Sequence, residues 1–303
     1  AFQQLADYRA AYNGFSTRIM PVELITATYT GVDSQAKIRN CINSLYRSNS
    51  LSYVVLGGDN TVVPDRDCHV VCGSYTENNM PTDLYYGGLD SSWDEDGDGV
   101  YGEANYLSTA DEGDLAYDVM VGRIPVRTAA DASAYINKLM RFESTQRPPA
   151  DFYKKVMFTG DLLWTNYTGA ARPSDLCNDG HSEFQAHTPV SDAEVWKRRA
   201  YRDFVKPFWT AGVFSVFLDT LTSWDGATAG DYLQNVANLN ARFNEGWHIV
   251  DMDTHGSTAS WALESGSYVA SSATALTGLT AVVYAEACLA GGFDDGEPSL
   301  SEA

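Results

Sequence analysis

The stretch IVDMDTHGSTASW, residues 249–261, decides the fold class of this chain, because it runs from an apolar strand pattern directly into a His-Gly pair. A second stretch, LTAVVYAEACLAGGF at residues 279–293, runs from an apolar strand pattern into Cys288. Ligands and catalytic groups in open α/β sheets lie just past the carboxyl ends of the strands. His255 and Cys288 both occupy that position, and we expect them to lie close together.

Strand and helix patterns alternate along the rest of the chain, which favours βα units and a mostly parallel sheet. We expect strands at 20–28 (MPVELITAT), 51–60, 116–126, 154–161 and 214–219. Apolar residues at helical spacing predict helices at 2–13, 34–48, 131–143, 191–209 and 231–244, with Asp131 as the N-cap of the third. The predicted fold is therefore α/β, with mostly parallel sheets flanked by helices.

Two α/β subdomains are expected, because Pro148 and Pro149 interrupt the pattern within a polar segment at 145–152. The N-terminal subdomain would cover 1–148 and the catalytic subdomain 149–303. The chain opens in the helical pattern FQQLADYRAAY and closes in SLSEA, and it shows no signal peptide. We therefore expect it to be a fragment, truncated at both ends.

The charge of the chain limits its partners. Its 303 residues carry 20 Lys and Arg against 40 Asp and Glu, a formal net charge of −20. Such a field repels nucleic acid and anionic membrane surfaces. No apolar run reaches the roughly 18 residues that a membrane-spanning helix needs. Protein or peptide substrates remain as expected partners, and the oligomeric state is left open.

The cysteine count does not indicate a disulfide-stabilised scaffold, because five cysteines in a chain of this size are few. An odd number leaves at least one thiol unpaired. No zinc-type spacing is present. The pairing of the first four stays open: Cys41, Cys68, Cys72 and Cys177.

The strand-end His and Cys fit the needs of a cysteine peptidase, which requires a thiolate and a nearby base or acid. It also requires donors for the oxyanion of the tetrahedral intermediate. Gly256 has no Cβ, so its backbone can approach a substrate carbonyl closely. The N–H groups of Gly256 and Cys288 are therefore the candidate oxyanion hole. A cysteine that is only a small buried hydrophobe remains the alternative at this point.

Several segments resemble a known family. DTHGSTASW resembles the Gly-His-Gly-Ser…Trp segment of gingipain-like peptidases, with Thr254 in place of the first glycine, and EACLAGGF resembles their Ala-Cys-x-x-Gly-x-Phe segment. His255 and Cys288 are 33 positions apart, as expected in that family. LSYVVLGGDNTVVP, PTDLYYG and YDVMVGRIPV resemble three earlier family segments in the right order. The chain is thus similar to gingipain-like cysteine peptidases, in the caspase, legumain and gingipain group.

The resemblance implies a caspase-hemoglobinase-like fold and a secreted cysteine endopeptidase, extracellular or at the cell surface. Cys288 would be the nucleophile that forms an acyl-enzyme, and His255 would move the proton. Two alternatives stay open. One is a secretion-associated processing or transpeptidase-type peptidase, and the other is a non-catalytic, calcium-dependent surface module of the same fold.

The family also implies a carboxylate that orients the histidine, at the end of the first strand of the second half. Asp161 occupies that place, although the family has a glutamate there. Asp251 and Asp253 are alternatives, because the period of a strand puts them on the same face as His255.

Substrate specificity is less readable. Trp261 matches a family tryptophan that flanks the substrate pocket, and packing beneath the loop is the equal alternative. The family's acidic pocket residue lies at the start of the helix expected at 191–209. Asp192 and Glu194 lie there, but so does the basic run 197–199, and 162–191 resembles an insertion. No residue preference at the scissile bond is predicted.

The segment DSSWDEDGDGVYGE, residues 90–103, is a candidate calcium loop. Three aspartates alternate within it, and two glycines permit tight turning. Its start matches the EF-hand pattern, but its glutamate falls at position ten instead of twelve. A solvated acidic turn is the alternative. We expect structural Ca²⁺ here, with five candidate ligands: Asp90, Asp94, Asp96, Asp98 and Glu103.

Overall fold

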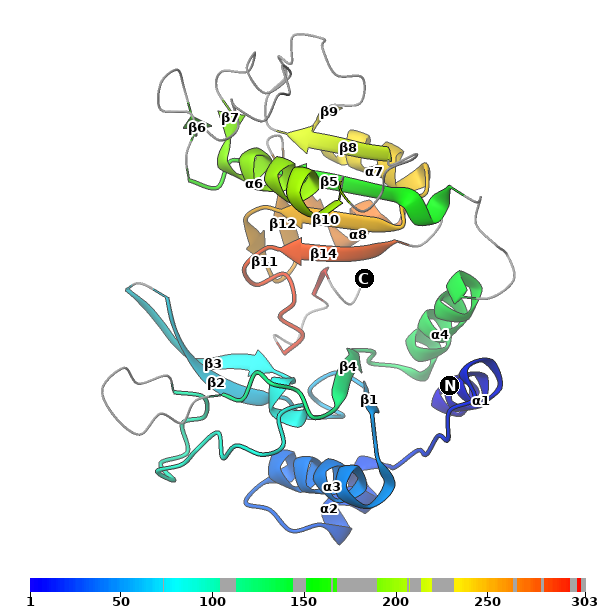
Figure 1. Ribbon diagram of the computed structural model, residues 1–303, viewed down its shortest axis with the longest axis vertical. Helices are drawn as coiled ribbons and strands as arrows, with labels where there is room; N and C mark the ends of the chain where they lie inside the picture. Colours follow the sequence, from blue (N-terminus) through cyan, green and yellow to red (C-terminus); the bar gives the residue numbers. More distant parts are fainter. Residues whose placement is uncertain are drawn as a thin grey trace. The chain divides into compact units, whose positions relative to one another are not determined.

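The computed structural model describes residues 1–72, 74–103, 113–143, 151–164, 166–167, 190–205, 207, 214–219, 232–263, 266–278, 281–294 and 299–300 (Figure 1). The chain divides into two compact units, Ala1–Met140 and Arg141–Ala303. The predicted boundary after residue 148 falls in a segment outside the described residues, a few positions beyond this division. Cys177 also lies outside the described residues. No described helix is long and apolar enough to cross a membrane.

The described residues of unit 1 form two small sheets. β1 (Tyr53–Gly57) and β4 (Met120–Ile124) pair in parallel, and β2 (Arg66–Cys72) and β3 (Tyr75–Thr82) form an antiparallel hairpin. Its core gathers apolar side chains of α3 and β1 with Tyr86 and Trp93. The helical elements are α1 (Phe2–Asn13), α2 (Val22–Thr28), α3 (Ser34–Asn49), the short 3₁₀ turn Leu84–Tyr86 and α4 (Ala129–Glu143), which runs into unit 2.

Helix α2 corrects the sequence prediction, which assigned a strand to MPVELITAT. The β-branched residues of this segment favour strands. Here, however, the hydroxyl of Thr26 donates to the carbonyl of Val22 and that of Thr28 to Leu24, four residues back in each case. Ile25 is buried in the core of unit 1. Packing of one apolar residue, with hydroxyls bonded along the helix, therefore outweighs the strand preference.

Two of the early motif segments meet in unit 1. Arg123, from YDVMVGRIPV, makes a bidentate pair with Asp83, from PTDLYYG, with N···O distances of 2.7 and 2.6 Å. The same guanidinium donates to the carbonyls of Gly58 and Val63. Its side chain is only 5% exposed. Arg123 therefore joins β4 to the loop after β1 and to the turn after β3, so these motifs are structural in unit 1.

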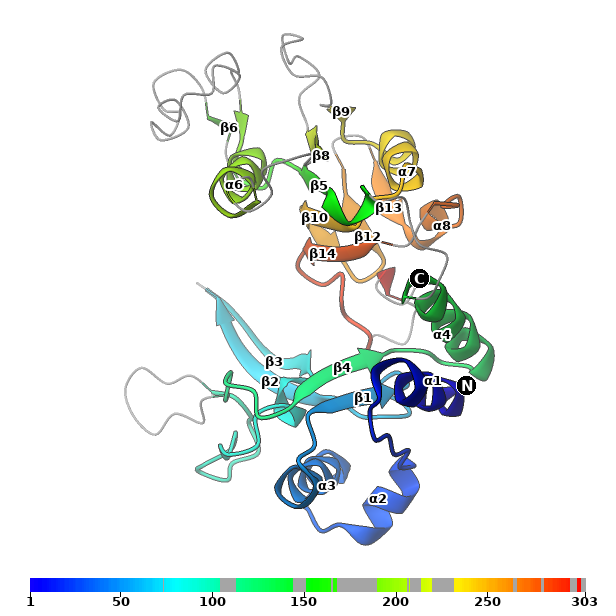
Figure 2. The same cartoon turned by 45° about the vertical axis from the view of Figure 1, so that its right-hand side comes forward.

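Unit 2 is a five-stranded parallel sheet in the order β14-β10-β5-β8-β9. Alternate side chains face opposite sides. Val250 and Met252 pack with Leu239 of α7, whereas Val156 and Phe158 pack on the other side near Ala200 of α6 (Figure 2). The strands are β5 (Lys155–Gly160), β8 (Phe214–Asp219), β9 (Tyr232–Leu233), β10 (Ile249–Asp253) and β14 (Val282–Glu286).

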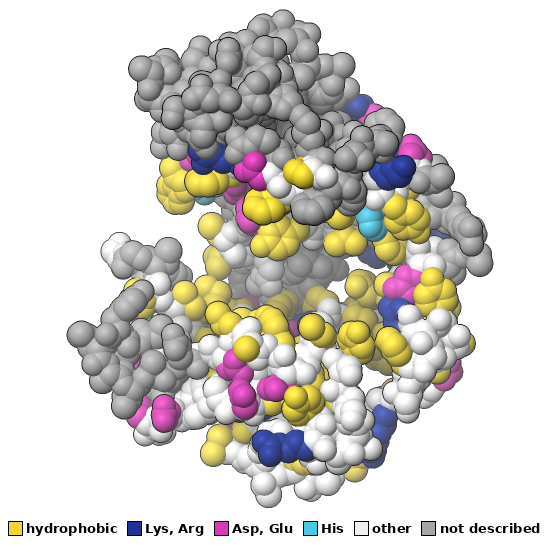
Figure 3. Space-filling view, viewed as in Figure 1, with side chains coloured by type: hydrophobic (Ala, Val, Ile, Leu, Met, Phe, Trp, Pro, Cys, Tyr) yellow, Lys and Arg dark blue, Asp and Glu magenta, His cyan; other side chains and the backbone are white. Residues whose placement is uncertain are grey.

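Further elements cover the sheet of unit 2. Helix α6 (Asp192–Ala200) continues into a π-helical turn, Tyr201–Val205, and α7 (Val236–Asn244) and α8 (Ala270–Ala273) are the other helices described here. Directly after β10 comes a small antiparallel sheet of β11 (Gly256–Ser257), β12 (Ser260–Ala262) and β13 (Ser267–Val269). β6 (Asn166–Tyr167) pairs with β7 (Val190–Ser191). Both units show acidic side chains on the face drawn in Figure 3.

Candidate active site

His255 and Cys288 follow the carboxyl ends of two neighbouring strands, β10 and β14. β10 and β14 pair in parallel with Asp253 opposite Glu286, and each candidate residue lies two positions beyond that pair. The N–H of Thr254 donates to the carbonyl of Glu286 at 3.1 Å, which carries the ladder one residue further. Adjacent strands are about 4.8 Å apart. The expected strand-end placement of both residues is therefore what the structure has.

Gly256 brings the two loops into contact. A Cβ on Gly256 would lie 2.3 Å from the carbonyl oxygen of Ala287 and 2.7 Å from its carbonyl carbon. Ala287 immediately precedes Cys288. From the sequence we expected a glycine here because it lets a substrate carbonyl approach. The structure gives a further reason for a residue without Cβ: the histidine loop packs directly on the backbone of the cysteine loop.

Cys288 is a free, exposed thiol on a tight turn. Its φ is +25°, a value that non-glycine residues rarely adopt. The turn is closed by the N–H of Ala290, which donates to the carbonyl of Ala287 at 2.8 Å. Strained backbone of this kind clusters at active sites. The exposure of Cys288 contradicts the alternative that it is a small buried hydrophobe.

The imidazole of His255 is held by a backbone carbonyl. Its Nε2 lies 3.0 Å from the carbonyl oxygen of Leu163. A carbonyl only accepts, so this bond assigns the proton to Nε2 and leaves Nδ1 as the basic nitrogen of the neutral ring. The indole of Trp164 packs edge-on against the imidazole, with ring centroids 5.5 Å apart.

Asp192, the first residue of α6, fixes the loop that holds His255. Its carboxylate accepts from the N–H of Leu163 at 2.9 Å and from that of Trp164 at 2.7 Å. Asp192 is 4% exposed. In the sequence Asp192 was a candidate for the substrate pocket only, and no role was predicted for Leu163 or Trp164. An aspartate at a helix start is expected to accept from N–H groups of its own helix, so no local pattern indicated these contacts, which are 28 and 29 positions apart in the chain.

Asp161 was the leading candidate to orient His255. In the structure it is 8% exposed, its Oδ1 accepts from the N–H of Leu162 at 2.8 Å, and its own N–H donates to the carbonyl of Asp253. It therefore lies at the predicted strand end. The ring contact of His255 described above goes to Leu163, so the orienting role of Asp161 stays a prediction.

A buried lysine pairs with one carboxylate in the middle of β10 and with another at the end of β14. Lys197 of α6 pairs with Asp251 at 2.9 Å and with Glu286 at 3.1 Å. Asp251, an alternative orienting residue, is thus bound to Lys197. Burial raises the pKa of Asp253, and the charges of Glu286, Asp192 and Asp251 act in the same direction while Lys197 opposes them. The sequence showed Lys197 only as part of a basic run.

Trp261 packs beneath the histidine loop. Its ring is 9% exposed and stacks on Tyr268, with centroids 5.7 Å apart, within the core of unit 2. These contacts support the packing alternative over a place in the pocket wall. Of the two pocket candidates at the start of α6, Asp192 is occupied by backbone N–H groups, and the side chain of Glu194 lies outside the described residues.

The acidic loop brings three of its five candidate ligands together. The carboxylates of Asp94, Asp96 and Asp98 lie within 4.8 Å of one another, and Glu103 is outside this group. The loop is closed at its base by Gly102, whose N–H donates to the carbonyl of the buried Trp93 at 2.9 Å. Gly97 and Gly99 have φ values of +76° and +88°, which glycine alone adopts without strain.

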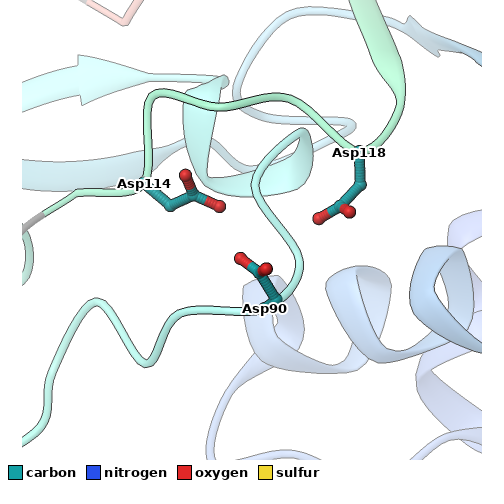
Figure 4. Close-up of side chains that lie close together, drawn as sticks. All are labelled: Asp90, Asp114 and Asp118. Atoms are coloured by element: carbon teal, nitrogen blue, oxygen red, sulfur yellow. The ribbon is translucent and has the colours of Figure 1, made fainter.

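Asp90 lies apart from the three grouped aspartates of the predicted ligand set. It precedes Trp93 and so lies outside the closed loop, and its carboxylate groups with those of Asp114 and Asp118 (Figure 4). A hydrogen bond shared with Asp114, and the charges of Asp114 and Asp118, raise the pKa of Asp90. The contact with Asp114 joins segments that are far apart in the sequence, which is why the local pattern did not indicate it.

Comparisons with known proteins agree with the motifs. The profile of Peptidase family C25 matches residues 1–303. The complex of Porphyromonas gingivalis RgpB pro- and mature domains has a TM-score of 0.63 at 14% identity, covering 99% of this chain and 56% of that one. The Arg-specific cysteine proteinase gingipain R (RgpB) has a TM-score of 0.62 at 16% identity, with 99% and 55% covered.

These likenesses in structure show the fold, and the chain spans about half the length of the structures it matches. A search of curated proteins finds no match. The caspase-like α/β architecture predicted from the sequence is confirmed by the same neighbours. The motifs, the fold and the family profile agree over the whole chain: it belongs to peptidase family C25, the gingipain family of cysteine peptidases.

Proposed function

We propose that the protein is a cysteine endopeptidase that uses Cys288 as the nucleophile and His255 as the proton carrier. The register of β10 and β14 carries this proposal, because it puts both residues two positions past one pair of register partners, Asp253 and Glu286. Family membership supports it. The exposed, unpaired thiol of Cys288 disfavours a non-catalytic module. A dedicated processing or transpeptidase-type enzyme would use the same two residues. It would differ from a general endopeptidase only in the group that accepts the acyl chain from Cys288 and in the range of its substrates.

The chemistry would run in two steps. Nδ1 of His255 takes the thiol proton, and the thiolate adds to the scissile carbonyl. The C–N bond then breaks as the imidazolium protonates the leaving amine, which leaves a thioester on Cys288. In the second step Nδ1 takes a proton from water, and the hydroxide attacks the thioester and releases the acid and the thiol. The hydrogen bond from Nε2 to the carbonyl of Leu163 holds the ring in the tautomer that these reaction steps require.

Gly256 and Cys288 would supply the oxyanion donors. The N–H of Ala262 donates to the carbonyl of His255 at 2.7 Å, so these two form a hydrogen-bonded pair of the β11–β12 hairpin. Antiparallel ladders alternate bonded and non-bonded pairs. The next pair, Gly256 with Trp261, is then non-bonded, and the N–H of Gly256 points away from β12. It is thereby free to act on an oxyanion.

We also propose that Asp94, Asp96 and Asp98 hold a structural Ca²⁺. Calcium binds hard oxygen ligands in flexible loops, and three carboxylates within 4.8 Å of one another on a glycine-containing turn fit that requirement. The ion would offset the mutual repulsion of these charges. An extracellular or cell-surface location, where calcium is plentiful, is part of the same proposal.

The test of the peptidase proposal is Cys288→Ala in the full-length protein. We expect this change to abolish hydrolysis of a peptide library and labelling by iodoacetamide at this position. Cys41 and Cys68 are internal controls, because burial raises the pKa of both thiols, that of Cys68 to about 12. Labelling mapped by peptide mass should therefore favour Cys288. Hydrolysis that persists in the variant would refute the assignment.

A further inference from the structure

Lys197 of α6 is buried against the two paired strands that lead to the candidate dyad. Its side chain is 5% exposed, and its ammonium donates to Asp251 of β10 at 2.9 Å and to Glu286 of β14 at 3.1 Å. Lysine is almost never fully buried unless it is paired. Asp251 lies four residues before His255, and Glu286 lies two residues before Cys288. The ion pairs therefore join the last residue of β14 to the middle of β10, in the two strands that lead to Cys288 and His255.

The ion pair with Lys197 should stabilise β14 more than a similar contact would stabilise the inner strands. It is the edge strand of the sheet, bonded to β10 alone, and all five of its residues are exposed. Strands with little burial open locally at low free-energy cost. Catalytic groups must stay within about 0.5 Å of their working geometry. Opening at the end of β14 would displace Cys288, which follows it directly.

We propose that Lys197 is a positioning residue that pins the end of β14 to β10 and thereby holds Cys288 in reach of His255. The proposal rests on the proposed peptidase function. On this proposal, α6 positions both residues of the candidate dyad. At its first residue the helix holds His255, through Asp192 and the carbonyl of Leu163. Less than two turns later it holds Cys288, through Lys197 and Glu286.

A lysine that only compensates buried charge would behave differently from a positioning residue. Charge compensation supports folding, so its loss lowers stability but leaves turnover by the folded fraction unchanged. Loss of the pin lowers kcat, because thiol and imidazole no longer meet in the right geometry, whereas substrate contacts, and hence KM, change little. The two roles are therefore separable by kinetics.

The kinetic experiment compares Lys197→Met and Lys197→Arg in the full-length protein. We expect Lys197→Met to lower kcat by up to about 100-fold, the effect of a misplacement of about 1 Å, with KM within about twofold of wild type. Lys197→Arg keeps the charge and the reach to both carboxylates and should recover most of kcat. Lys155→Met is the matched control, because Lys155 pairs with Asp151 at the opposite end of β5.

A second measurement tests the pin without any peptidase assay. Hydrogen exchange of the backbone amides should become faster over 282–288 in Lys197→Met and stay unchanged there in Lys155→Met. Glu286→Ala removes only the β14 half of the bridge at a half-exposed residue, so it serves if Lys197→Met does not fold. It should show the same faster exchange.

Each outcome decides one question. Normal kcat in Lys197→Met, or unchanged exchange over 282–288, would overturn the positioning role. Failure of Lys197→Arg to recover kcat would also overturn it. If the wild-type protein cleaves no peptide, the proposed peptidase function fails, and the exchange experiment still decides whether Lys197 holds the end of β14.

Discussion

Single residues set the distance between the histidine and cysteine loops. Gly256 and Ala287 are in backbone contact, and the turn that begins at Ala287 puts Cys288 at a φ of +25°. Neither loop can shift without moving the other, because the space between them is smaller than a methyl group. The geometry of the candidate dyad is therefore fixed by the absence of one Cβ.

Gly256→Ala tests this contact. The added methyl would lie 2.3 Å from the carbonyl oxygen of Ala287, so one loop has to move. Overpacking of this kind costs about 1–3 kcal/mol, and the displaced Cys288 should lower kcat by up to about 100-fold. Melting temperature and steady-state kinetics measure the two effects.

The matched control for that substitution is Gly291→Ala. Gly291 lies on the cysteine loop, and a Cβ there would meet no atom within 4 Å. We expect kcat and melting temperature close to wild type. Equal losses in both variants, or none in Gly256→Ala, would mean that the backbone contact does not position the site.

The strand-end positions of His255 and Cys288 could be predicted from the sequence, because they follow from hydrophobic periodicity and the topology of parallel sheets, whereas their catalytic role stays a proposal. The contact with Leu163 could not be predicted from the sequence, because the acceptor for the imidazole is a backbone carbonyl, which every residue type has. Lys197 was missed for another reason. Its burial comes from two carboxylates that are 54 and 89 positions away in the chain.

At the scale of elements, helix ends show what local patterns can and cannot give. Asp131 was expected to be the N-cap of α4. The structure gives that position to Thr128, whose hydroxyl accepts from the N–H of Asp131, while the carboxylate of Asp131 accepts from the N–H of Thr128. The reciprocal hydrogen bonds form a capping box. Asp131 therefore does take part in capping α4, but the N-cap lies three residues before it, at Thr128. The segments of β5, β8, β10 and β14 were predicted as strands, whereas Tyr232–Leu233, which was expected to begin a helix at 231, is strand β9.

The acidic loop is the element whose proposed ion can be removed. Chelation by EGTA should lower the melting temperature, because three neighbouring carboxylates lose their counter-charge, and calcium should restore it. Calcium at about 100 times its Kd would contribute about 2.7 kcal/mol. Differential scanning calorimetry at constant ionic strength, with Mg²⁺ as the alternative ion, measures the shift.

Two variants separate the loop from its surroundings. Asp96→Asn should remove the calcium response, because Asp96 belongs to the three-carboxylate group, whereas Glu103→Gln should keep it, because Glu103 lies outside that group. A melting curve that does not respond to EGTA would remove the calcium proposal. A response lost in Glu103→Gln as well would restore the larger ligand set expected from the sequence.

At the scale of the whole molecule, the charge balance acts on every element at once. The net charge of −20 belongs to a chain that also has buried ion pairs, such as Arg123 with Asp83. Acidic side chains lie on both units in the view of Figure 3. Repulsion among like surface charges destabilises the compact state, while the buried pairs are little affected by salt.

Salt should therefore stabilise this protein. Raising NaCl from about 0.01 M to 0.1 M shortens the Debye length from about 30 Å to about 10 Å, which screens repulsion across the surface. A gain of about 1 kcal/mol would raise the melting temperature by about 2 °C in a chain of 303 residues. The scans are made in EGTA, so that calcium does not contribute. If the melting temperature falls with NaCl instead, attractive ion pairs outweigh the net repulsion, and the acidic surface is organised in pairs that the formal charge conceals.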